Sequence, residues 1–355
     1  MKNNNKFSSL IDEMKLNPKT WLVTGSAGFI GSNLVEFLLK NNQFVIGIDN
    51  FSTGYQTNLD EIRDNIDEEL WINFIFIDGD IRDMQACEKA FNSSSNFHSD
   101  SVDFVLHQAA IGSVPRSIED PIFSHSNNIS GFLNILFCAK EHGVKKFVYA
   151  TSSSVYGDEP SLPKVEEKIG NLLSPYALTK LTNELYAEVF SLNYGLQTVG
   201  LRYFNVFGPR QDPNGAYAAV IPKWINRFIL NKTVEIYGDG ETTRDFCFIE
   251  NVIQANILAA KSSMKVNESR VFNIAVGSQI NLLDLALLIK ENLIEHNISS
   301  NFQIENAEFR KGDIRHSLAD INNAKKSLSY QPSHTVQMGL KQSMEWYLYS
   351  ANKKD

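Results

Sequence analysis

The sequence lacks the features of secreted, membrane-spanning and nucleic-acid-binding proteins. Its only cysteines are Cys87, Cys138 and Cys247, an odd number of widely separated residues that we interpret as incidental thiols in a reducing compartment. No apolar run approaches the length of a membrane span. The net charge of −8 argues against broad nucleic-acid binding, although a pocket can still be locally positive for an anionic small molecule.

The first 19 residues also lack the apolar core of a signal peptide, so we expect a cytoplasmic protein. Four apolar residues between Phe7 and Met14 have the spacing of a short helix that ends before Pro18. A loose tail fits this segment equally well. Neither form is expected to carry chemistry.

A glycine-rich turn follows the first apolar strand, which contains Leu22 and Val23. Gly25, Gly28 and Gly31 precede a helical pattern, and residues without Cβ let a phosphate approach the backbone at the start of a helix. The next strand ends in Asp49, about 20 residues after the glycines, where a carboxylate can accept the ribose hydroxyls of NAD. Together these features predict a dinucleotide site.

Strand and helix patterns alternate as far as Asn205, which predicts a parallel, doubly wound sheet with ligands at the carboxyl ends of its strands. The pattern loosens from Val206, where we expect an isolated strand at 233–237, and from Asn281 we expect mixed helix and loop. The predicted fold class is α/β, a Rossmann-type sheet with a smaller mixed α/β substrate-binding domain. The predicted boundaries are 1–205, joined by about 245–278, for the NAD-binding domain, and 206–244 with 279–355 for the smaller one. Within the larger domain the predicted strands include 71–77, and the predicted helices include 121–142 and 174–190.

Tyr176 and Lys180 lie four residues apart, which places both on one face of a helix. A phenol with a pKa near 10 is a poor base at neutral pH, but a neighbouring ammonium and a positively charged nicotinamide lower that pKa. The Tyr-x-x-x-Lys spacing alone is common. A serine cluster at the end of the preceding strand, including Ser152, makes it specific, because such a set can remove a proton from a sugar hydroxyl while NAD takes the hydride.

Nine ordered segments of the sequence resemble the extended short-chain dehydrogenase/reductases, and among these the nucleotide-sugar 4-epimerases. The segments are TGSAGFIGSNL, DNFSTG, GDIRD, HQAA, SSSVYG, SPYALTK, RYFNVFGPRQ, YGDGETTRDF and RKGDIRHSLAD. The greatest similarity is to bacterial epimerases of UDP-N-acetylglucosamine and UDP-N-acetylgalactosamine, including those that act on the uronic acids. It covers nearly the whole chain, and it implies a homodimer joined through the helices at 121–142 and 175–193.

The resemblance also implies a role for each matching residue. The catalytic residues are Ser152, Tyr176 as base and Lys180 as its partner. The expected NAD contacts are Gly25, Gly28, Phe29, Ile30, Gly31, Asp49, Asn50, Ser52, Thr53, Gly54, Asp80, Ile81, Gln108, Ala109, Ala110, Tyr176, Lys180 and Tyr203. The expected UDP-sugar contacts are Ser113, Ser152, Ser153, Asn205, Ala219, Val220, Tyr237, Arg244, Arg310, Asp313 and Ser317. The last of these flanks the sugar pocket, where family members restricted to non-acetylated sugars carry tyrosine and those accepting an N-acetyl group carry a small residue.

Three alternatives have different sequence requirements. Sugar-nucleotide dehydratases and decarboxylases need an acidic residue beside the catalytic serine, whereas here the first carboxylate after Ser152 is Asp158. A non-catalytic NAD-binding protein could keep the fold, but the intact Ser152, Tyr176 and Lys180 set argues against it. A zinc enzyme is disfavoured because the histidines show no ligand-like spacing.

Overall fold

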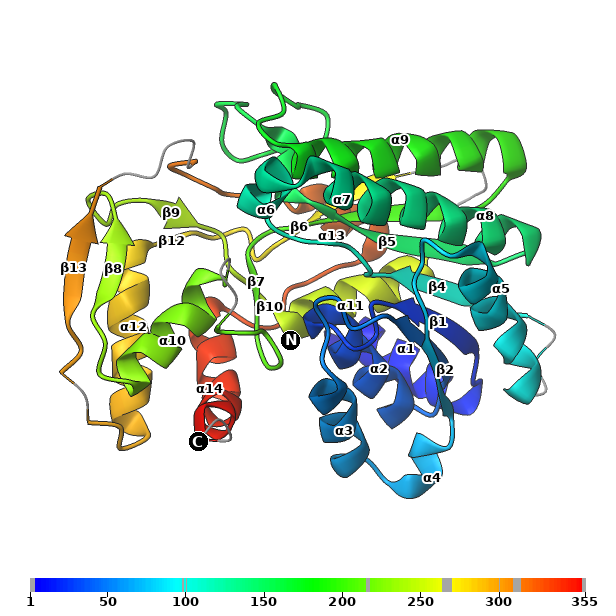
Figure 1. Cartoon of the computed structure of the whole chain (residues 1–355), viewed down its shortest axis with the longest axis horizontal. Helices are drawn as coiled ribbons and strands as arrows, with labels where there is room; N and C mark the ends of the chain where they lie inside the picture. The colour runs from blue at the N-terminus through cyan, green and yellow to red at the C-terminus, as the bar shows by residue number, and fades with distance from the viewer. Residues whose placement is uncertain are drawn as a thin grey trace.

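The computed structural model describes residues 4–97, 99, 101–214, 218–263, 270–299, 301–308 and 314–352. Its largest sheet has seven strands in the order β11-β6-β5-β4-β1-β2-β3, and all neighbouring strands are parallel (Figure 1). Those strands are β1 (Thr20–Thr24), β2 (Phe44–Asp49), β3 (Phe74–Asp78), β4 (Phe104–His107), β5 (Lys146–Ser152), β6 (Thr198–Tyr203) and β11 (Arg270–Ile274). The order reverses beside β1, so the predicted doubly wound sheet is confirmed.

Helices cover both faces of this sheet, because successive strand residues point to opposite sides. Trp21 and Val23 of β1 belong to one buried cluster and Leu22 to the other, and all three are fully buried. The helices that pack here include α2 (Phe29–Lys40), α3 (Gln56–Asp64), α5 (Met84–Asn92), α8 (Phe132–Glu141), α9 (Pro175–Tyr194) and α11 (Ile249–Ala260). No helix in the described ranges is long and apolar enough to cross a bilayer.

Three local expectations need refinement. The N-terminal segment forms helix α1 (Asn4–Leu16), which is fixed by Phe7 stacking on Phe37 at 6.3 Å between ring centroids and by the buried Met14. The strand expected from Trp71 begins only at Phe74, after the short helix α4 (Glu68–Trp71). The helix expected over 121–142 is α7 (Pro121–His125) and α8 joined by a π-helical turn, Ser126–Gly131.

A second group of elements lies beside the sheet, on the left of Figure 1. It contains α10 (Val220–Ile229), β8 (Val234–Tyr237), β9 (Thr243–Arg244), β12 (Ile280–Asn281), α12 (Leu282–Glu295), β13 (Ile304–Ala307) and α14 (Val336–Asn352). The strand at 233–237 is not isolated, because β8 pairs in parallel with β13. We missed β13 because it is short and two of its four residues are exposed, which leaves no clear apolar alternation.

Two shorter elements connect the groups. The pair β7 (Val206–Phe207) and β10 (Cys247–Phe248) lies between them in Figure 1. Helix α13 (Asn322–Leu328), although late in the sequence, packs against β11 and α11 of the main sheet. The chain therefore passes between the two groups more than once, at the carboxyl ends of β6 and β11.

Candidate active site

A cavity of about 320 Å³ opens where β1 turns into α2. Gly25 has a φ of +68°, and a Cβ on Gly31 would lie 2.0 Å from the carbonyl oxygen of Gly25, so both positions require glycine. The predicted NAD contacts that line this cavity are Gly25, Gly28, Phe29, Ile30, Gly31, Asp49, Asn50, Ser52, Thr53, Ile81, Gln108, Ala109 and Ala110. Gly54, Asp80, Tyr176, Lys180 and Tyr203 are not among its lining residues.

The carboxylate of Asp49 is held at the edge of this cavity. It accepts hydrogen bonds from the backbone amides of Ala27 (2.9 Å) and Phe51 (2.8 Å), and the residue is 9% exposed. Burial raises the pKa of Asp49, and the amide donors oppose that shift. This arrangement, a glycine-rich turn at a helix N-terminus and a fixed acid on the next strand, fits a dinucleotide. Asp49 would accept hydrogen bonds from the ribose hydroxyls of that dinucleotide.

Two predicted residues support the cavity from behind. Asp80 accepts a hydrogen bond from the Asn50 side chain at 2.8 Å and forms an ion pair with Arg82. Gly54 packs on Ala27, since a Cβ there would lie 2.8 Å from the Ala27 carbonyl carbon. Asp80 therefore ties the loop after β2 to the segment after β3, and Gly54 packs that loop against the glycine turn.

Tyr203 and Gln108 belong to a ring of side chains that includes Asn256, a residue we did not predict. The Tyr203 hydroxyl donates to Gln108 at 3.2 Å and accepts from Asn256 at 2.8 Å, while Gln108 donates to Asn256 at 3.2 Å. Asn256 is fully buried in the apolar helix α11. Asn251 and Gln254 are also polar and buried in this helix, so nothing in the sequence singled out Asn256.

The predicted catalytic residues come from neighbouring elements. Ser152 ends β5, and Tyr176 and Lys180 occupy the first turns of α9, which is capped by Ser174. The Lys180 ammonium donates to the Ala150 carbonyl at 2.9 Å and lies 5.9 Å from the centroid of the Tyr176 ring. A hydrogen bond joins the side chains of Ser152 and Tyr176. The structure therefore brings all three together.

The electrostatics of this group differ from our expectation in one respect. Burial raises the pKa of Tyr176, and the hydrogen bond with Ser152 only partly opposes that shift. Lys180 is buried as well, and its burial lowers its pKa to about 8. Glu184 stabilises the Lys180 ammonium, although Glu184 also forms a buried ion pair with Arg202 at 2.7 Å.

The other predicted sugar contacts lie on short segments near these residues. Ser113 has a φ of +99° and caps α6 (Val114–Glu119) by accepting a hydrogen bond from Arg116 at 3.2 Å. Ser117 in the same helix accepts the backbone amide of Tyr176 at 3.0 Å, a contact we did not predict. Ser153 directly follows Ser152 and is partly buried.

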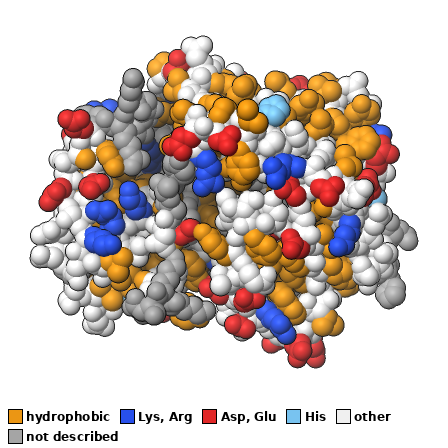
Figure 2. Space-filling view, viewed as in Figure 1, with side chains coloured by type: hydrophobic (Ala, Val, Ile, Leu, Met, Phe, Trp, Pro, Cys, Tyr) orange, Lys and Arg blue, Asp and Glu red, His pale blue; other side chains and the backbone are white. Residues whose placement is uncertain are grey.

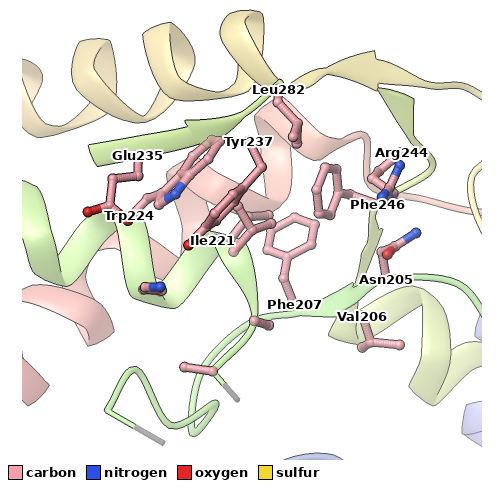
Figure 3. A pocket seen from close by; sticks show the side chains of 14 residues that line it. Asn205, Val206, Phe207, Ile221, Trp224, Glu235, Tyr237, Arg244, Phe246 and Leu282 are labelled. Carbon is pink, nitrogen blue, oxygen red and sulfur yellow. The ribbon is translucent and has the colours of Figure 1, made fainter. Parts of the chain in front are cut away.

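A second pocket of about 280 Å³ contains most of the predicted UDP contacts (Figure 3). Asn205 and Arg244 lie together on one side of it, and Tyr237 lies on the other. Its predicted lining residues are Asn205, Ala219, Val220, Tyr237 and Arg244. Its unpredicted ones are Val206, Phe207, Ala218, Ile221, Lys223, Trp224, Glu235, Phe246 and Leu282.

Ser317 lies beside this pocket and not among its lining residues. Its backbone amide donates to the carbonyl of Thr243 at 3.1 Å, and the guanidinium of Arg244 donates to that same carbonyl at 2.9 Å. The two residues are thus fixed next to each other. The predicted contacts Arg310 and Asp313 fall outside the described residues.

Asp245, another residue we did not single out, anchors this region. Its carboxylate is fully buried and accepts the amides of Val276 (3.0 Å), Gly277 (3.1 Å) and Ala319 (3.3 Å). Burial raises the pKa of Asp245 to about 7, and the three amide donors oppose that shift. It therefore ties the segment that holds Ser317 to the end of β11.

Within the parts of the chain that the structure describes, no three His, Cys, Asp or Glu residues gather as a metal site. His107 is buried at the end of β4, within 2.9 Å of the Thr24 hydroxyl, and burial lowers its pKa to about 3. It is a neutral core residue.

Comparison with known proteins identifies the family. Residues 21–275 match the family described as NAD dependent epimerase/dehydratase. A putative UDP-glucose 4-epimerase of Methanocaldococcus jannaschii is 34% identical over 326 residues, which is 92% of this chain and 97% of that protein.

Solved structures agree. A UDP-N-acetylglucosamine 4-epimerase from Methanobrevibacter ruminantium, in complex with UDP-N-acetylmuramic acid, is 37% identical with a TM-score of 0.82, covering 94% of this chain and 99% of that one. A UDP-glucuronic acid 4-epimerase from Bacillus cereus, in complex with UDP-glucuronic acid and NAD, is 30% identical with a TM-score of 0.80, covering 93% and 99%. The chain therefore belongs to the NAD dependent epimerase/dehydratase family of extended short-chain dehydrogenases/reductases, and its cofactor is NAD.

Proposed function

We propose that this protein is an isomerase that inverts carbon 4 of a UDP-N-acetylhexosamine, converting UDP-N-acetylglucosamine to UDP-N-acetylgalactosamine or acting on the corresponding uronic acids. The main support is the position of the Ser152, Tyr176 and Lys180 cluster. The cluster lies at the end of β5, which is between β4 and β6 in the sheet. The residues that follow β4 line the first cavity, and the residues that follow β6 line the second pocket.

Each residue of the cluster has a chemical task. Tyr176 takes the proton of the sugar 4-hydroxyl, and Ser152 shares that proton through its hydrogen bond to the phenol. Lys180, fixed by the Ala150 carbonyl, stabilises the phenolate that forms. NAD held in the cavity at the glycine turn would supply the redox chemistry at carbon 4.

The second pocket suits a uridine diphosphate. Arg244 offers a guanidinium to the diphosphate, and Asn205 beside it offers an amide. Tyr237 and the Ala219–Val220 pair provide apolar surface for the uracil ring. Arg310 and Asp313 complete the UDP site in this proposal because of their motif positions. The keto sugar turns about the fixed UDP, so reduction occurs on its opposite face and net redox is zero.

Ser317 motivates the choice of an acetylated sugar. The relatives named above act on glucose, N-acetylglucosamine or glucuronic acid derivatives, so similarity alone does not select among these. A small residue beside Arg244 leaves room for an acetamido group. Ser113 and Ser153 are the proposed hydroxyl contacts of the sugar.

The dehydratase and decarboxylase alternative lacks an acid where it needs one. Asp158 accepts hydrogen bonds from the backbone and side chain of Asn171, at 2.6 and 3.0 Å, and is exposed. Val155 is buried in the core. A non-catalytic NAD-binding role is the second alternative. The products that the purified protein forms from UDP-sugars distinguish the three proposals.

We also propose a cytoplasmic homodimer. Hydrophobic side chains gather over α7, α8 and α9 in Figure 2. The exposed ones include Ile122, Phe137, Leu178, Leu185, Val189 and Leu192. Two copies of this face could bury them in a four-helix interface. The division into domains at 1–205 with 245–278, and 206–244 with 279–355, stays a prediction.

The test is incubation of the purified protein with UDP-N-acetylglucosamine, UDP-N-acetylgalactosamine, their uronic acids, UDP-glucose and UDP-galactose, without added NAD. Chromatography of the products should show interconversion of an acetylated pair at the highest kcat/KM. Preference for a non-acetylated pair contradicts the substrate assignment. A 4-keto-6-deoxy or decarboxylated product supports the dehydratase alternative, and absence of any product supports the non-catalytic one.

A further inference from the structure

Residues 208–212, which we call the strap, continue from β7 toward the start of α10. Both residues of β7 line the second pocket, and so do Ala218, Ala219 and Val220 beyond the strap. The strap therefore lies, in sequence, between two segments that line that pocket. Its own contacts, however, are mainly with the cofactor side of the molecule.

Asn33 in α2 links the strap to the first turn of the cofactor helix. Its side-chain amide donates to the carbonyl of Phe29 at 2.8 Å and to that of Pro209 at 3.0 Å. Phe29 lines the NAD cavity. One side chain thus joins a cofactor residue to the strap.

A second link comes from the loop after β2. The Tyr55 hydroxyl donates to the Asp212 carboxylate at 2.7 Å, and the backbone amide of Tyr55 donates to Ala27 in the glycine turn at 3.0 Å. This loop also contains the cavity residues Ser52 and Thr53. The far end of the strap is therefore held by the cofactor loop.

Arg210 makes a third link. Its guanidinium is ion-paired to Glu36 of α2, and its Nε lies 3.5 Å from Glu61 of α3. Arg210 is 6% exposed and has a φ of +68°, an uncommon conformation for a residue with a side chain. Burying an ion pair and straining the backbone both cost free energy, so these features point to a positional role.

We propose that Arg210 is a positioning residue that aligns the sugar-nucleotide pocket with the cofactor site, so that the reacting carbon and the cofactor are held at hydride-transfer distance. This inference rests on the proposed function. Either site could form without the link, but their mutual placement would loosen. Misplacement by about 1 Å from a change far from the chemistry can cost on the order of 100-fold in rate.

The test compares Arg210→Lys and Tyr55→Phe with the control Lys341→Met, which removes an exposed ion pair between α14 and α12 (3.8 Å to Glu295). Arg210→Lys keeps the charge but cannot reach both carboxylates as a planar fork. We expect kcat to fall roughly 10- to 100-fold in Arg210→Lys and several-fold in Tyr55→Phe. In both variants the bound NAD per subunit and the Kd for UDP, measured by calorimetry on the holoenzyme, should stay within about threefold of wild type.

The control should match wild type in all three quantities. If Arg210→Lys has a lower thermal midpoint but an unchanged kcat, Arg210 has only a structural role and the inference is overturned. The inference is also overturned if bound NAD or UDP affinity falls in proportion to kcat. If Arg210→Lys does not fold, Tyr55→Phe decides, since it removes one hydroxyl from a residue that is 48% exposed. A wild type without turnover overturns the proposed function instead.

Discussion

The cofactor cavity and the sugar-nucleotide pocket are built from different chemical material. The cofactor cavity is formed where backbone meets backbone: a Cβ on Gly25 would lie 2.8 Å from the amide of Ala109, and one on Gly31 would clash with Gly25. The second pocket is lined by side chains, with aromatic residues such as Trp224 and Tyr237 and the cation Arg244 (Figure 3).

This difference has a consequence for how each site can change. Backbone walls cannot be altered by a substitution without moving the chain, so the cofactor half has little freedom at its glycines. Side-chain walls can change shape and charge one residue at a time. A substitution at the glycines of the cofactor half should therefore abolish NAD binding as a whole, whereas substitutions in the substrate half should change substrate selectivity in small steps.

The largest expected effect is at the Ser152, Tyr176 and Lys180 cluster, at the end of β5 between β4 and β6. Tyr176→Phe removes the proton acceptor but keeps the ring, so we expect epimerisation to fall about 10²- to 10⁴-fold. Bound NAD, measured by absorbance after denaturation of the protein, should be unchanged. A loss below about tenfold would contradict the assignment of Tyr176 as the base.

Gly31→Ala tests the backbone wall. The added methyl would lie 2.0 Å from the Gly25 carbonyl oxygen, so the turn must move. We expect a loss of roughly 1–3 kcal/mol in the free energy of unfolding, together with loss of bound NAD. Ala27→Gly also changes this turn by one methyl group but adds no clash, so it is the control and should retain NAD. Full NAD content in Gly31→Ala would show that this wall is more adaptable than we infer.

Asp245→Asn tests the anchor of the substrate half. Both carboxylate oxygens accept amide hydrogens, so the asparagine NH₂ group would face a donor whichever way it turns. We expect a loss of about 1–3 kcal/mol in unfolding free energy and weaker UDP binding, with NAD content unchanged. Equal loss of both ligands would show that the two halves depend on Asp245 alike.

The same carboxyl group should give a pH signature. Its folded pKa of about 7 lies above the ordinary value of 3.8, so the folded chain holds this proton where the unfolded chain has released it. The contribution of this group to stability is therefore full below about pH 4 and is lost as the pH rises toward 7. Denaturant unfolding of wild type and Asp245→Asn across this range should differ in slope, and identical slopes would contradict the raised pKa.

The same contrast explains what could be predicted from the sequence. Contiguous motifs at strand ends predicted most residues that line the cavity at the glycine turn, because a glycine turn and a strand-terminal acid leave a local pattern. Asn256 and Ser117 were missed, since one buried polar side chain produces no periodicity. In the second pocket, Trp224 and Phe246 have the same apolar pattern as core residues. Only the family resemblance located Asn205 and Arg244 there, because their partners are distant in sequence.

Ser317→Tyr has the smallest expected effect and tests whether the substrate half changes by degrees. The backbone of Ser317 is fixed to Thr243 beside Arg244, so a larger side chain at this partly buried position cannot easily move aside. The tyrosine ring would occupy space that the proposed acetamido group needs while the sugar turns. Because Ser317 lies beside the pocket and not in its lining, we expect a selectivity change on the order of tenfold, the low end for steric discrimination.

The measurement is kcat/KM for the acetylated and non-acetylated pairs in wild type, Ser317→Tyr and the control Ser317→Ala. The control keeps the space open and should retain the wild-type preference. In Ser317→Tyr, activity on UDP-N-acetylglucosamine should fall more than activity on UDP-glucose, with NAD content unchanged, because the backbone-built half is not touched. Equal losses on both pairs would mean that Ser317 supports the fold of the pocket and does not select the sugar. The acetylated substrate would then lose its structural argument, while the epimerase assignment would still rest on Tyr176.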